Sequence, residues 1–401
     1  MFSEAGEKHS MPADVIRERV RSLGRRAAKG VVGSLFDLAR HVPGLSLARG
    51  KVRASEVLAG TQPNIDRTDF QHSFRVKEEV PDDRAEPRHR PIDTLHLLLD
   101  TRDARYSCRN NVVIGPGNMV IYEDGIPFEE MSVRLRWLER PRRISGSVGY
   151  LSNTDPGNYY HWFAWMLPLM GTYRDRLGID PDFYYVGRPV RSFHLETLAR
   201  AGVAPNRVLS DAVVADRLIA DSPDRKRREG AVDRSMLAFS RGLFFEPPQA
   251  APTRRLYVSR GEGSRRRVTN EARLIEHAAQ YGFEKISMDG RTVANQAQLF
   301  AEAAFVIAPH GAALTNMLFA MPGARVLELL PDRPSPLVAI DAPVLTLFRE
   351  ICAFVGCPYD CIFGEPLSSQ RHLPQSIADF SISFDEFRDK LAAMLASERR
   401  P

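Results

Sequence analysis

The chain has 401 residues, 43% of them hydrophobic and 9% aromatic, and its formal net charge is +5. This composition excludes a largely disordered chain, and the length suffices for two domains and a tail. No window reaches the roughly 18–20 apolar residues that span a bilayer, and the N-terminus lacks the apolar region of a secretory signal. We therefore expect a cytoplasmic protein whose positive charge suits an anionic substrate or membrane surface, with nucleic acid as an alternative.

Residues 1–90 are predicted to contain a basic amphipathic helix followed by a linker. Apolar residues recur at helical spacing between Val15 and Leu38, and arginines cover the other faces. Such a helix lies in an anionic membrane interface or docks on the protein's own surface, and the pattern allows both. Residues 61–91 are charged and contain prolines, which is typical of a linker.

Residues 91–250 are predicted to form an α/β domain with a mostly parallel sheet, because apolar strand-like runs alternate with helical patterns. The turn pair Asp124-Gly125 follows an expected hairpin. The expected strands are residues 95–99, 111–114, 119–122, 183–186, 207–209 and 217–220, and the expected helices begin at residue 159 and at residue 192.

An aromatic helix begins after the loop Asp155-Pro156-Gly157 and carries His161 among tyrosines and tryptophans. A histidine in such a helix is either a satisfied core residue or a functional group. An unperturbed imidazole titrates at a pKa of about 6.5, which suits a general base. The residues alone leave both interpretations open.

Residues 251–401 are predicted to form a second α/β domain after the Pro- and Ala-rich linker of residues 247–253. Strand and helix alternate here in a Rossmann-like half. We therefore expect two Rossmann-like domains facing a cleft. The expected strands are residues 256–259, 284–288, 305–308 and 325–330, and the expected helices are 270–281, 295–303, 313–319 and 384–395.

The strand–loop–helix of residues 305–319 carries a predicted anion site. The strand ends at Pro309, and His310-Gly311 forms the turn before the helix. Backbone N–H groups near Gly311 and Ala312 should therefore point outward at a helix N-terminus.

Arg260 follows another predicted strand of the same sheet, so it should face the same crevice as His310. A guanidinium, a histidine and a helix N-terminus together suit a diphosphate. The basic run Arg265 to Arg267 is either part of that site or a solvated surface. Glu328 is either an acceptor for ribose hydroxyls or an ordinary strand-end charge.

Cys352, Cys357 and Cys361 lie close together in the sequence. A zinc site would need His372 as a fourth ligand, and the spacing departs from the usual C-x2-C pairs. Free thiols in a reducing compartment are the favoured interpretation, so we expect no metal.

Three blocks of sequence together resemble glycosyltransferase family 61. That family includes bacterial capsular polysaccharide enzymes and eukaryotic xylosyl- and N-acetylglucosaminyltransferases. The resemblance covers roughly residues 95–335. One departure is visible in the predicted helix before Leu299-Phe300, where this chain has Asn295-Gln296 and family members often carry Glu-Gln. The blocks are Asn158-Tyr-Tyr-His-Trp-Phe163; Tyr257-Val-Ser-Arg260 with Arg267-x-x-Asn270-Glu271; and Pro309-His-Gly-Ala-Ala-Leu-Thr-Asn316.

The resemblance implies a GT-B-like fold and inverting transfer of a sugar from a nucleotide-diphosphate donor to a polysaccharide or lipid-linked glycan, without cofactor or metal. His161 would be the catalytic base, with Asp155 in reserve. The donor would be held by the remaining candidates. These are Arg260, Arg267, His310, Gly311 and Ala312 for the diphosphate, and Asn316, Glu328, Asn270 and Glu271 for the nucleoside and its loop.

A different class of function also accounts for the arginines. The protein could be an inactive binder of anions, nucleic acid or membranes. Arginines grouped at predicted strand ends, instead of along one face, favour the transferase. Transfer of a phosphosugar is a further alternative, which release of a nucleoside monophosphate would reveal.

Overall fold

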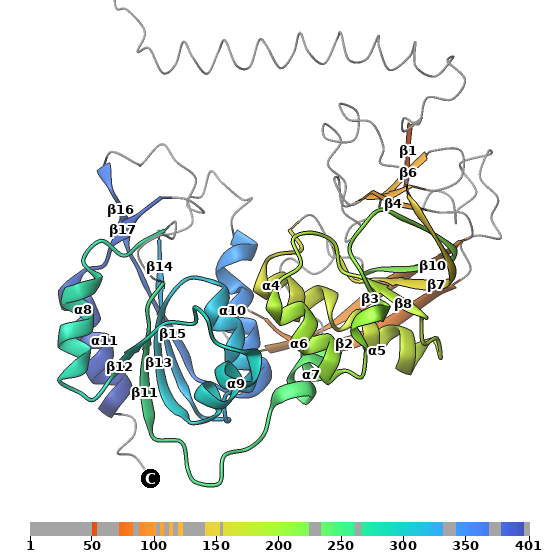
Figure 1. Ribbon diagram of the computed structural model, residues 1–401. Coiled ribbons are helices and arrows are strands. Elements are labelled where there is room, and N and C mark those ends of the chain that lie inside the picture. The colour runs from red at the N-terminus through yellow and green to blue at the C-terminus, as the bar shows by residue number, and fades with distance from the viewer. Residues whose placement is uncertain are drawn as a thin grey trace, which may run out of the picture.

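Two sheets organise the chain, one in each half (Figure 1). The computed structural model describes residues 141–152, 155–223, 234–260, 266–331, 342–368 and 378–396, and the backbone of strands between residues 50 and 122. The amphipathic pattern of residues 15–38 and the residue His372 lie outside the described residues.

The N-terminal half is built on a ten-stranded mixed sheet. Its strands are β1 (Gly50–Arg53), β2 (His72–Asp82), β3 (Arg88–Thr101), β4 (Arg105–Ser107), β5 (Val112–Ile114), β6 (Met119–Tyr122), β7 (Arg142–Tyr150), β8 (Phe183–Tyr185), β9 (Val208–Leu209) and β10 (Val213–Pro223). The main path runs β1-β6-β5-β4-β10-β7-β8-β9, while β3 pairs with β10 and β2 pairs with β3.

Only part of this sheet is parallel. The run β10-β7-β8-β9 and the pair β1 and β6 are parallel, whereas the other pairings are antiparallel. Consecutive strands without a crossover helix pair antiparallel, and this corrects the expectation of a Rossmann-like N-terminal domain. The hairpin of β5 and β6 is confirmed. Strand β2 lies within residues 61–91, where the sequence suggested a linker.

The helices of the N-terminal half lie beside the parallel part of the sheet (Figure 1). The segment that begins at Tyr159 alternates short α and π turns instead of forming one regular helix. The helices are α4 (Tyr159–His161), η3 (Trp162–Met166), α5 (Leu169–Gly171), η4 (Thr172–Arg176), α6 (Ser192–Arg200), η5 (Pro205–Arg207) and α7 (Arg234–Phe244).

The C-terminal half contains a parallel five-stranded sheet in the order β12-β11-β13-β14-β15, which confirms the expected strand and helix alternation. Its elements are β11 (Arg254–Val258), α8 (Glu271–Ala279), β12 (Glu284–Ile286), α9 (Val293–Ala301), β13 (Ala303–Pro309), η7 (Ala312–Phe319), β14 (Arg325–Leu330), α10 (Ala342–Val355), β15 (Tyr359–Phe363) and α11 (Phe384–Ala396). A separate antiparallel pair consists of β16 (Glu365–Pro366) and β17 (Phe380–Ser381).

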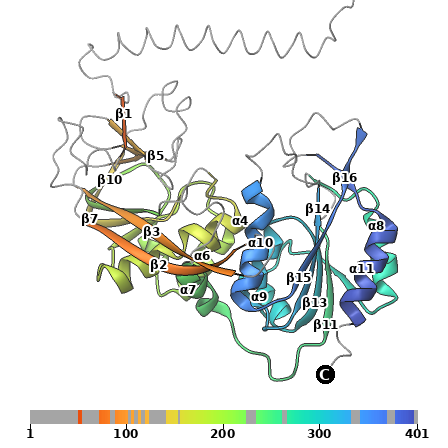
Figure 2. The same cartoon turned by 180° about the vertical axis from the view of Figure 1, so that it is seen from behind.

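Helices cover both faces of the C-terminal sheet (Figure 2). Helices α8 and α11 pack on the outer face, and α9 and α10 lie on the face toward the N-terminal half. Strand β13 is almost wholly buried, as expected for a parallel strand covered on both sides. The Rossmann-like prediction therefore holds for this half.

One apolar core continues across the two halves. Phe163 of η3 packs edge to face on Phe319 of η7, with ring centroids 5.9 Å apart. Arg241 of α7 donates to the carbonyls of Leu318 and Ala320 at the end of η7. The halves are therefore joined by packed side chains as well as by the connection of residues 245–253, which has no helix or strand.

Within the described part of the chain, no helix combines the length and apolar character needed to cross a bilayer.

Candidate functional site

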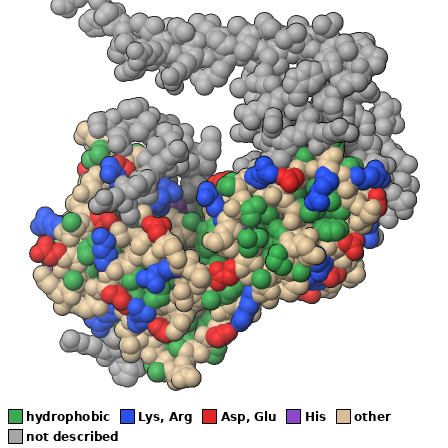
Figure 3. Space-filling view, viewed as in Figure 1, with side chains coloured by type: hydrophobic (Ala, Val, Ile, Leu, Met, Phe, Trp, Pro, Cys, Tyr) green, Lys and Arg blue, Asp and Glu red, His purple; other side chains and the backbone are tan. Residues whose placement is uncertain are grey.

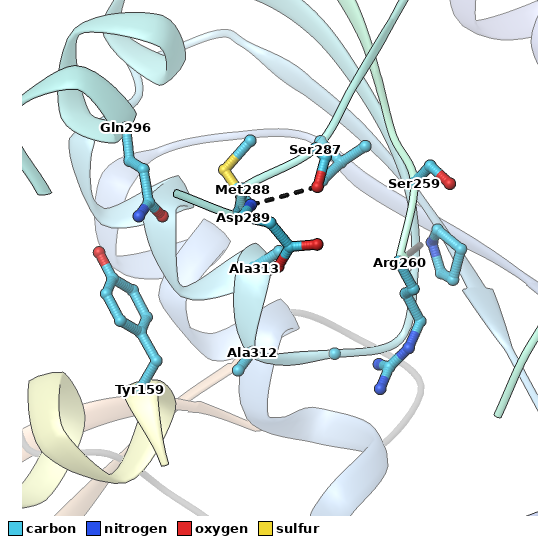
Figure 4. Close-up of a pocket in the computed structure, with 12 residues that line it drawn as sticks. Tyr159, Ser259, Arg260, Ser287, Met288, Asp289, Gln296, Ala312 and Ala313 are labelled. Atoms are coloured by element: carbon cyan, nitrogen blue, oxygen red, sulfur yellow. Dashed lines mark hydrogen bonds between the residues drawn. The ribbon is translucent and has the colours of Figure 1, made fainter. Parts of the chain in front are cut away.

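A pocket of about 290 Å³ lies beyond the carboxyl ends of β11, β12 and β13 (Figure 4). This is the edge of a parallel sheet where ligands bind. Its wall also includes Tyr159 of α4, so both halves of the chain contribute. The lining residues are Tyr159, Val258, Ser259, Arg260, Ser287, Met288, Asp289, Gln296, Pro309, Gly311, Ala312 and Ala313.

Arg260 follows β11, and its guanidinium lies over the loop after β13. Its Nη1 donates to the carbonyl of His310 at 2.5 Å. Burial, and after it the charge of Arg266, lower the pKa of Arg260 to about 10. The guanidinium therefore remains charged at neutral pH.

Gly311 permits this close approach. Its φ of 173° is extended backbone that any residue adopts, so its role is not conformational. A Cβ at this position would overlap the Arg260 guanidinium. The glycine of the His-Gly turn therefore leaves room for the arginine.

Arg266 supplies a second, half-buried positive charge near Arg260. Its φ of 59° places it in the left-handed region, which is unusual for a residue with a side chain. Burial lowers the pKa of Arg266, and the charge of Glu328 opposes that effect. Among the described residues, the buried Nε atoms of Arg260 and Arg266 have no hydrogen-bond acceptor. Two such guanidinium groups suit an anionic ligand.

The N-terminus of η7 adds backbone dipoles at the same place. The first hydrogen bond of this 3₁₀ helix runs from Leu314 N to Gly311 O. The N–H groups of Ala312 and Ala313 therefore precede the helical hydrogen bonds, and both residues line the pocket. Such groups favour an anion.

His310 turns its imidazole away from this pocket and toward the core. Its Nδ1 lies 2.6 Å from Oε1 of Glu328, and the ring packs near Phe348. The hydroxyl of Tyr359 donates to the other oxygen of Glu328 at 2.5 Å. As a carboxylate accepts only, Nδ1 carries the hydrogen and Nε2 is the remaining nitrogen.

Glu328 is fully buried, with both oxygens bonded to these two side chains. The expectation that Glu328 binds the nucleoside does not agree with this position. Glu328 instead orients His310 and supplies the buried negative charge beside Arg266. The prediction for His310 also differs from the structure. Its neighbours Pro309 and Gly311 line the pocket, but the imidazole of His310 does not.

Arg267 lies away from the diphosphate position that the sequence suggested. Its guanidinium bonds to Asp379 at 3.0 and 3.2 Å, and its backbone N–H bonds to the same carboxylate. Asn270 also departs from expectation, because its amide donates to the carbonyl of Ile382 and accepts from the N–H of that residue. Both side chains fasten the chain near β17 instead of contacting the pocket.

Glu271 opens α8 and lies behind the pocket wall. Its Oε2 accepts from the hydroxyl of Ser259 at 3.0 Å, and burial raises its pKa. Ser259 itself lines the pocket. Glu271 therefore supports a lining residue and lies outside the lining set.

Asn316 connects the two halves at the pocket. It accepts from the Tyr159 hydroxyl at 2.9 Å and donates to Oε1 of Gln296 at 2.8 Å. It also donates to the carbonyl of Ala313 at 3.0 Å, which holds the start of η7. Burial raises the pKa of Tyr159, so its hydroxyl remains a donor.

His161 and Asp155 are close in sequence to Tyr159, which lines the pocket, but neither of the two is a lining residue. The His161 ring packs on Trp165 with centroids 4.6 Å apart. Asp155 is exposed in the preceding loop and accepts from the amide of Asn158, the residue that caps α4.

His194 holds this loop from behind. Its Nδ1 accepts from the N–H of Arg191, so Nε2 donates to the carbonyl of Pro156 at 2.9 Å. Burial lowers the pKa of His194 to about 4. This histidine is neutral and structural at neutral pH.

Sequence reasoning missed several lining residues. Tyr159 and Gln296 lie within sequence blocks that the resemblance covers, but neither side chain was assigned a role from the sequence. Ser287 to Asp289 directly follow the second strand of the Rossmann-like half, and the rule that ligands bind at strand ends could have identified them.

The three neighbouring cysteines are free thiols. Burial raises the pKa of Cys357 to about 11, which disfavours its thiolate. Across the described residues, no group of three histidine, cysteine or acidic side chains could hold a metal ion.

Basic residues do not form a stripe on the face shown in Figure 3. Lysine and arginine side chains alternate there with acidic ones. This distribution gives no support to an extended nucleic-acid surface on that face.

A parallel sheet with a pocket at its carboxyl edge, lined by Arg260 and by the N-terminus of η7, is an arrangement that suits an anionic ligand. Residues 159–327, a stretch that begins at α4, contains η7 and ends halfway along β14, match the sequence model of the family Glycosyltransferase 61. This match confirms the resemblance to glycosyltransferase family 61 and supports a glycosyltransferase activity. No curated protein matches the chain.

Proposed function

We propose that the protein transfers a sugar from a nucleotide-diphosphate donor to a hydroxyl of a cell-surface polysaccharide or lipid-linked glycan, with inversion at the anomeric carbon. The observation that carries this proposal is the pocket at the carboxyl ends of β11 and β13, where Arg260 lies over the loop before η7. A donor diphosphate there would meet the guanidinium group of Arg260 and the N-terminal dipole of η7, with the charge of Arg266 outside the pocket lining.

The same groups would assist departure of the leaving group. When the bond between the anomeric carbon and the diphosphate oxygen breaks, negative charge grows on the diphosphate. Positioned guanidinium groups in a partly buried site stabilise that charge. We therefore propose a transfer that needs neither a metal nor a cofactor, and neutral replacement of Arg260 should slow it.

The acceptor hydroxyl must lose its proton as its oxygen forms the new glycosidic bond, so the reaction needs a general base. His161 is the first candidate and Asp155 the second. His161 belongs to the same helical turn as Tyr159, which lines the pocket. The acceptor would enter from the side of α4, and the donor would occupy the C-terminal half, in the manner of a GT-B enzyme.

The biological setting follows from the proposed acceptor. A capsular or similar polysaccharide assembled on a lipid carrier would place the enzyme at the cytoplasmic face of a membrane. The basic pattern of residues 15–38 suits a peripheral contact there. Deletion of residues 1–40 should weaken sedimentation with anionic vesicles while leaving hydrolysis of a soluble donor intact.

The proposal is tested by incubating the purified full chain with a panel of nucleotide sugars and glycan acceptors. Release of nucleoside diphosphate with a labelled glycan product supports it. Release of nucleoside monophosphate would indicate phosphosugar transfer. Protein that binds no nucleotide diphosphate and turns over no donor would instead be a binding protein with an inactive site.

The catalytic base is tested separately. His161→Ala should abolish transfer and retain donor affinity, with Asp155→Ala as the comparison. Wild-type turnover in His161→Ala together with loss in Asp155→Ala would transfer the role to Asp155.

A further inference from the structure

The order β12-β11-β13-β14-β15 places the pocket at a topological switch point. Helix α8 leaves β11 toward one face of the sheet, and α9 leads into β13 from the other face (Figure 1). The crevice between these two connections is where doubly wound sheets bind nucleotides. Residues that follow β11, β12 and β13 therefore all line this crevice.

Asp289 is the acidic residue that β12 brings to this crevice. The strand ends at Ile286, and the N–H of Asp289 donates to the Ser287 hydroxyl at 3.1 Å in the turn that follows. Gly290 then adopts a φ of 73°, which redirects the chain toward α9. The turn thus holds the backbone of Asp289 at the pocket edge.

The Asp289 side chain extends into the pocket, across from Arg260 (Figure 4). It is exposed, unlike Glu328 and Glu271. Glu328 is bonded to His310 and Tyr359, and Glu271 to Ser259. Among the described residues, no hydrogen bond or ion pair engages the Asp289 carboxylate.

A carboxylate in an anion pocket must face a neutral part of the ligand, since a phosphate would be repelled. A carboxylate is an acceptor only, so its partner must donate hydrogens. In a nucleotide-sugar donor, the ribose and the transferred sugar both offer hydroxyl donors beside the diphosphate. The crevice that Asp289 borders is where doubly wound sheets bind nucleotides, so the ribose is the part assigned to it. Arg260 and Asp289 therefore complement the charged and the neutral halves of one ligand.

We propose that Asp289 accepts hydrogen bonds from the ribose hydroxyls of the donor, which makes the pocket selective for ribonucleotides. This assignment rests on the proposed donor site. It gives Asp289 the role that the sequence suggested for Glu328, and it makes the 2′-hydroxyl a determinant of donor affinity.

The test measures binding of nucleoside diphosphates to the purified full chain by calorimetry. The probes are uridine, guanosine and cytidine diphosphates, their 2′-deoxy forms, and deoxythymidine diphosphate. Wild type should bind the preferred ribonucleotide roughly tenfold or more tightly than its deoxy form, as expected for hydrogen bonds to a charged acceptor. Asp289→Ala should bring both forms to a similar, weaker affinity.

Two control variants complete the experiment. Asp289→Asn keeps an acceptor oxygen and should retain part of the discrimination. Glu276→Ala removes an exposed carboxylate of α8 that lies outside the pocket lining, and it should change neither affinity.

The possible failures are distinguishable. Wild type that binds ribo and deoxy forms equally, or prefers deoxythymidine diphosphate, overturns the role of Asp289 but leaves the donor site intact. Discrimination that persists in Asp289→Ala also overturns it. Wild type that binds none of these probes overturns the donor site itself.

Discussion

Arg260 and Arg267 belong to the same basic segment but contact different parts of the molecule. Arg260 lies over the His310 carbonyl at the pocket, whereas Arg267 pairs with Asp379 near β17. The sequence could not separate them, because Asp379 is distant in the chain and Arg266 adopts a positive φ that redirects the segment. Side-chain direction in this loop depends on tertiary partners.

Arg260→Ala should therefore weaken binding of a nucleoside diphosphate about tenfold or more, because it removes a charged donor. Arg267→Ala should leave that affinity unchanged and lower the free energy of unfolding by about 1 kcal/mol, since this ion pair is partly exposed. Both predictions are tested by measuring, for each variant, nucleotide affinity by calorimetry and the free energy of unfolding by chemical denaturation. Equal loss of affinity in the two variants would contradict the assignment.

Gly311→Ala should act through Arg260. The added Cβ would overlap the guanidinium and displace it from the His310 carbonyl, so donor affinity should fall. In an Arg260→Ala background the same substitution should cost little more, because the overlapping group is gone. A double-mutant cycle of binding free energies measures this coupling. Additive losses would show that Gly311 acts independently of the arginine.

His194 should make stability depend on pH. Its pKa is about 4 in the folded protein, compared with about 6.5 for an ordinary histidine. As pH falls through 6.5 the unfolded chain gains a proton that the folded chain does not, so stability is lost between pH 6.5 and 4. The full effect is on the order of 3 kcal/mol.

Urea unfolding at pH 7 and pH 5 tests this expectation. The loss of stability should shrink in His194→Gln, whereas His277→Gln should retain the wild-type loss. Identical pH dependence in all three proteins would exclude His194 as the cause.

At the scale of elements, the strand–loop–helix of residues 305–319 was predictable from local signals. A buried apolar run, Pro309 and the His-Gly turn define β13 and the start of η7. The hydrogen bond between Tyr359 and Glu328 was not predictable from the sequence. It depends on the pairing of β14 with β15, and no local pattern indicated the strand β15. Local pattern indicated where the pocket is, and strand pairing determined which carboxylate faces it.

The π turn of η3 has a chemical cause and a specific partner. Leu167 donates to the carbonyl of Trp162, and Pro168 has no N–H to offer to the carbonyl of Phe163. The hydroxyl of Ser240 on α7 donates to that carbonyl at 2.6 Å instead. The bond ties α7 to the turn that follows His161.

Ser240→Ala should leave the buried Phe163 carbonyl without its donor and lower the free energy of unfolding by about 1–3 kcal/mol. Ser383→Ala provides the comparison, because its bond to the N–H of Glu386 is exposed and 3.4 Å long, so its loss should be smaller. Urea unfolding of both variants at neutral pH measures the difference. An equal or smaller loss in Ser240→Ala would show that the carbonyl finds another donor.

At the scale of the molecule, the apolar core does not stop at the boundary between the halves. Phe163, Phe319 and residues of α7 belong to one buried cluster. Glu196 of α6 also accepts from the N–H groups of Val293 and Ala294 at the start of α9, where a carboxylate stabilises a helix N-terminus. A large apolar interface of this kind favours joint unfolding over independent domains.

Donor binding should therefore stabilise the N-terminal half together with the C-terminal half, which supplies most of the pocket lining. All three tryptophans, Trp137, Trp162 and Trp165, precede the C-terminal sheet, so their fluorescence reports on the N-terminal half. Nucleoside diphosphate at about 100 times its dissociation constant should raise the free energy of unfolding by roughly 2.7 kcal/mol for the part of the chain that unfolds together with the pocket. The unfolding midpoints measured by tryptophan fluorescence and by circular dichroism should then rise together. The Phe319→Ala substitution should lower both midpoints. If the nucleotide raises the unfolding midpoint measured by circular dichroism but leaves the fluorescence midpoint unchanged, the two halves unfold separately despite their shared core.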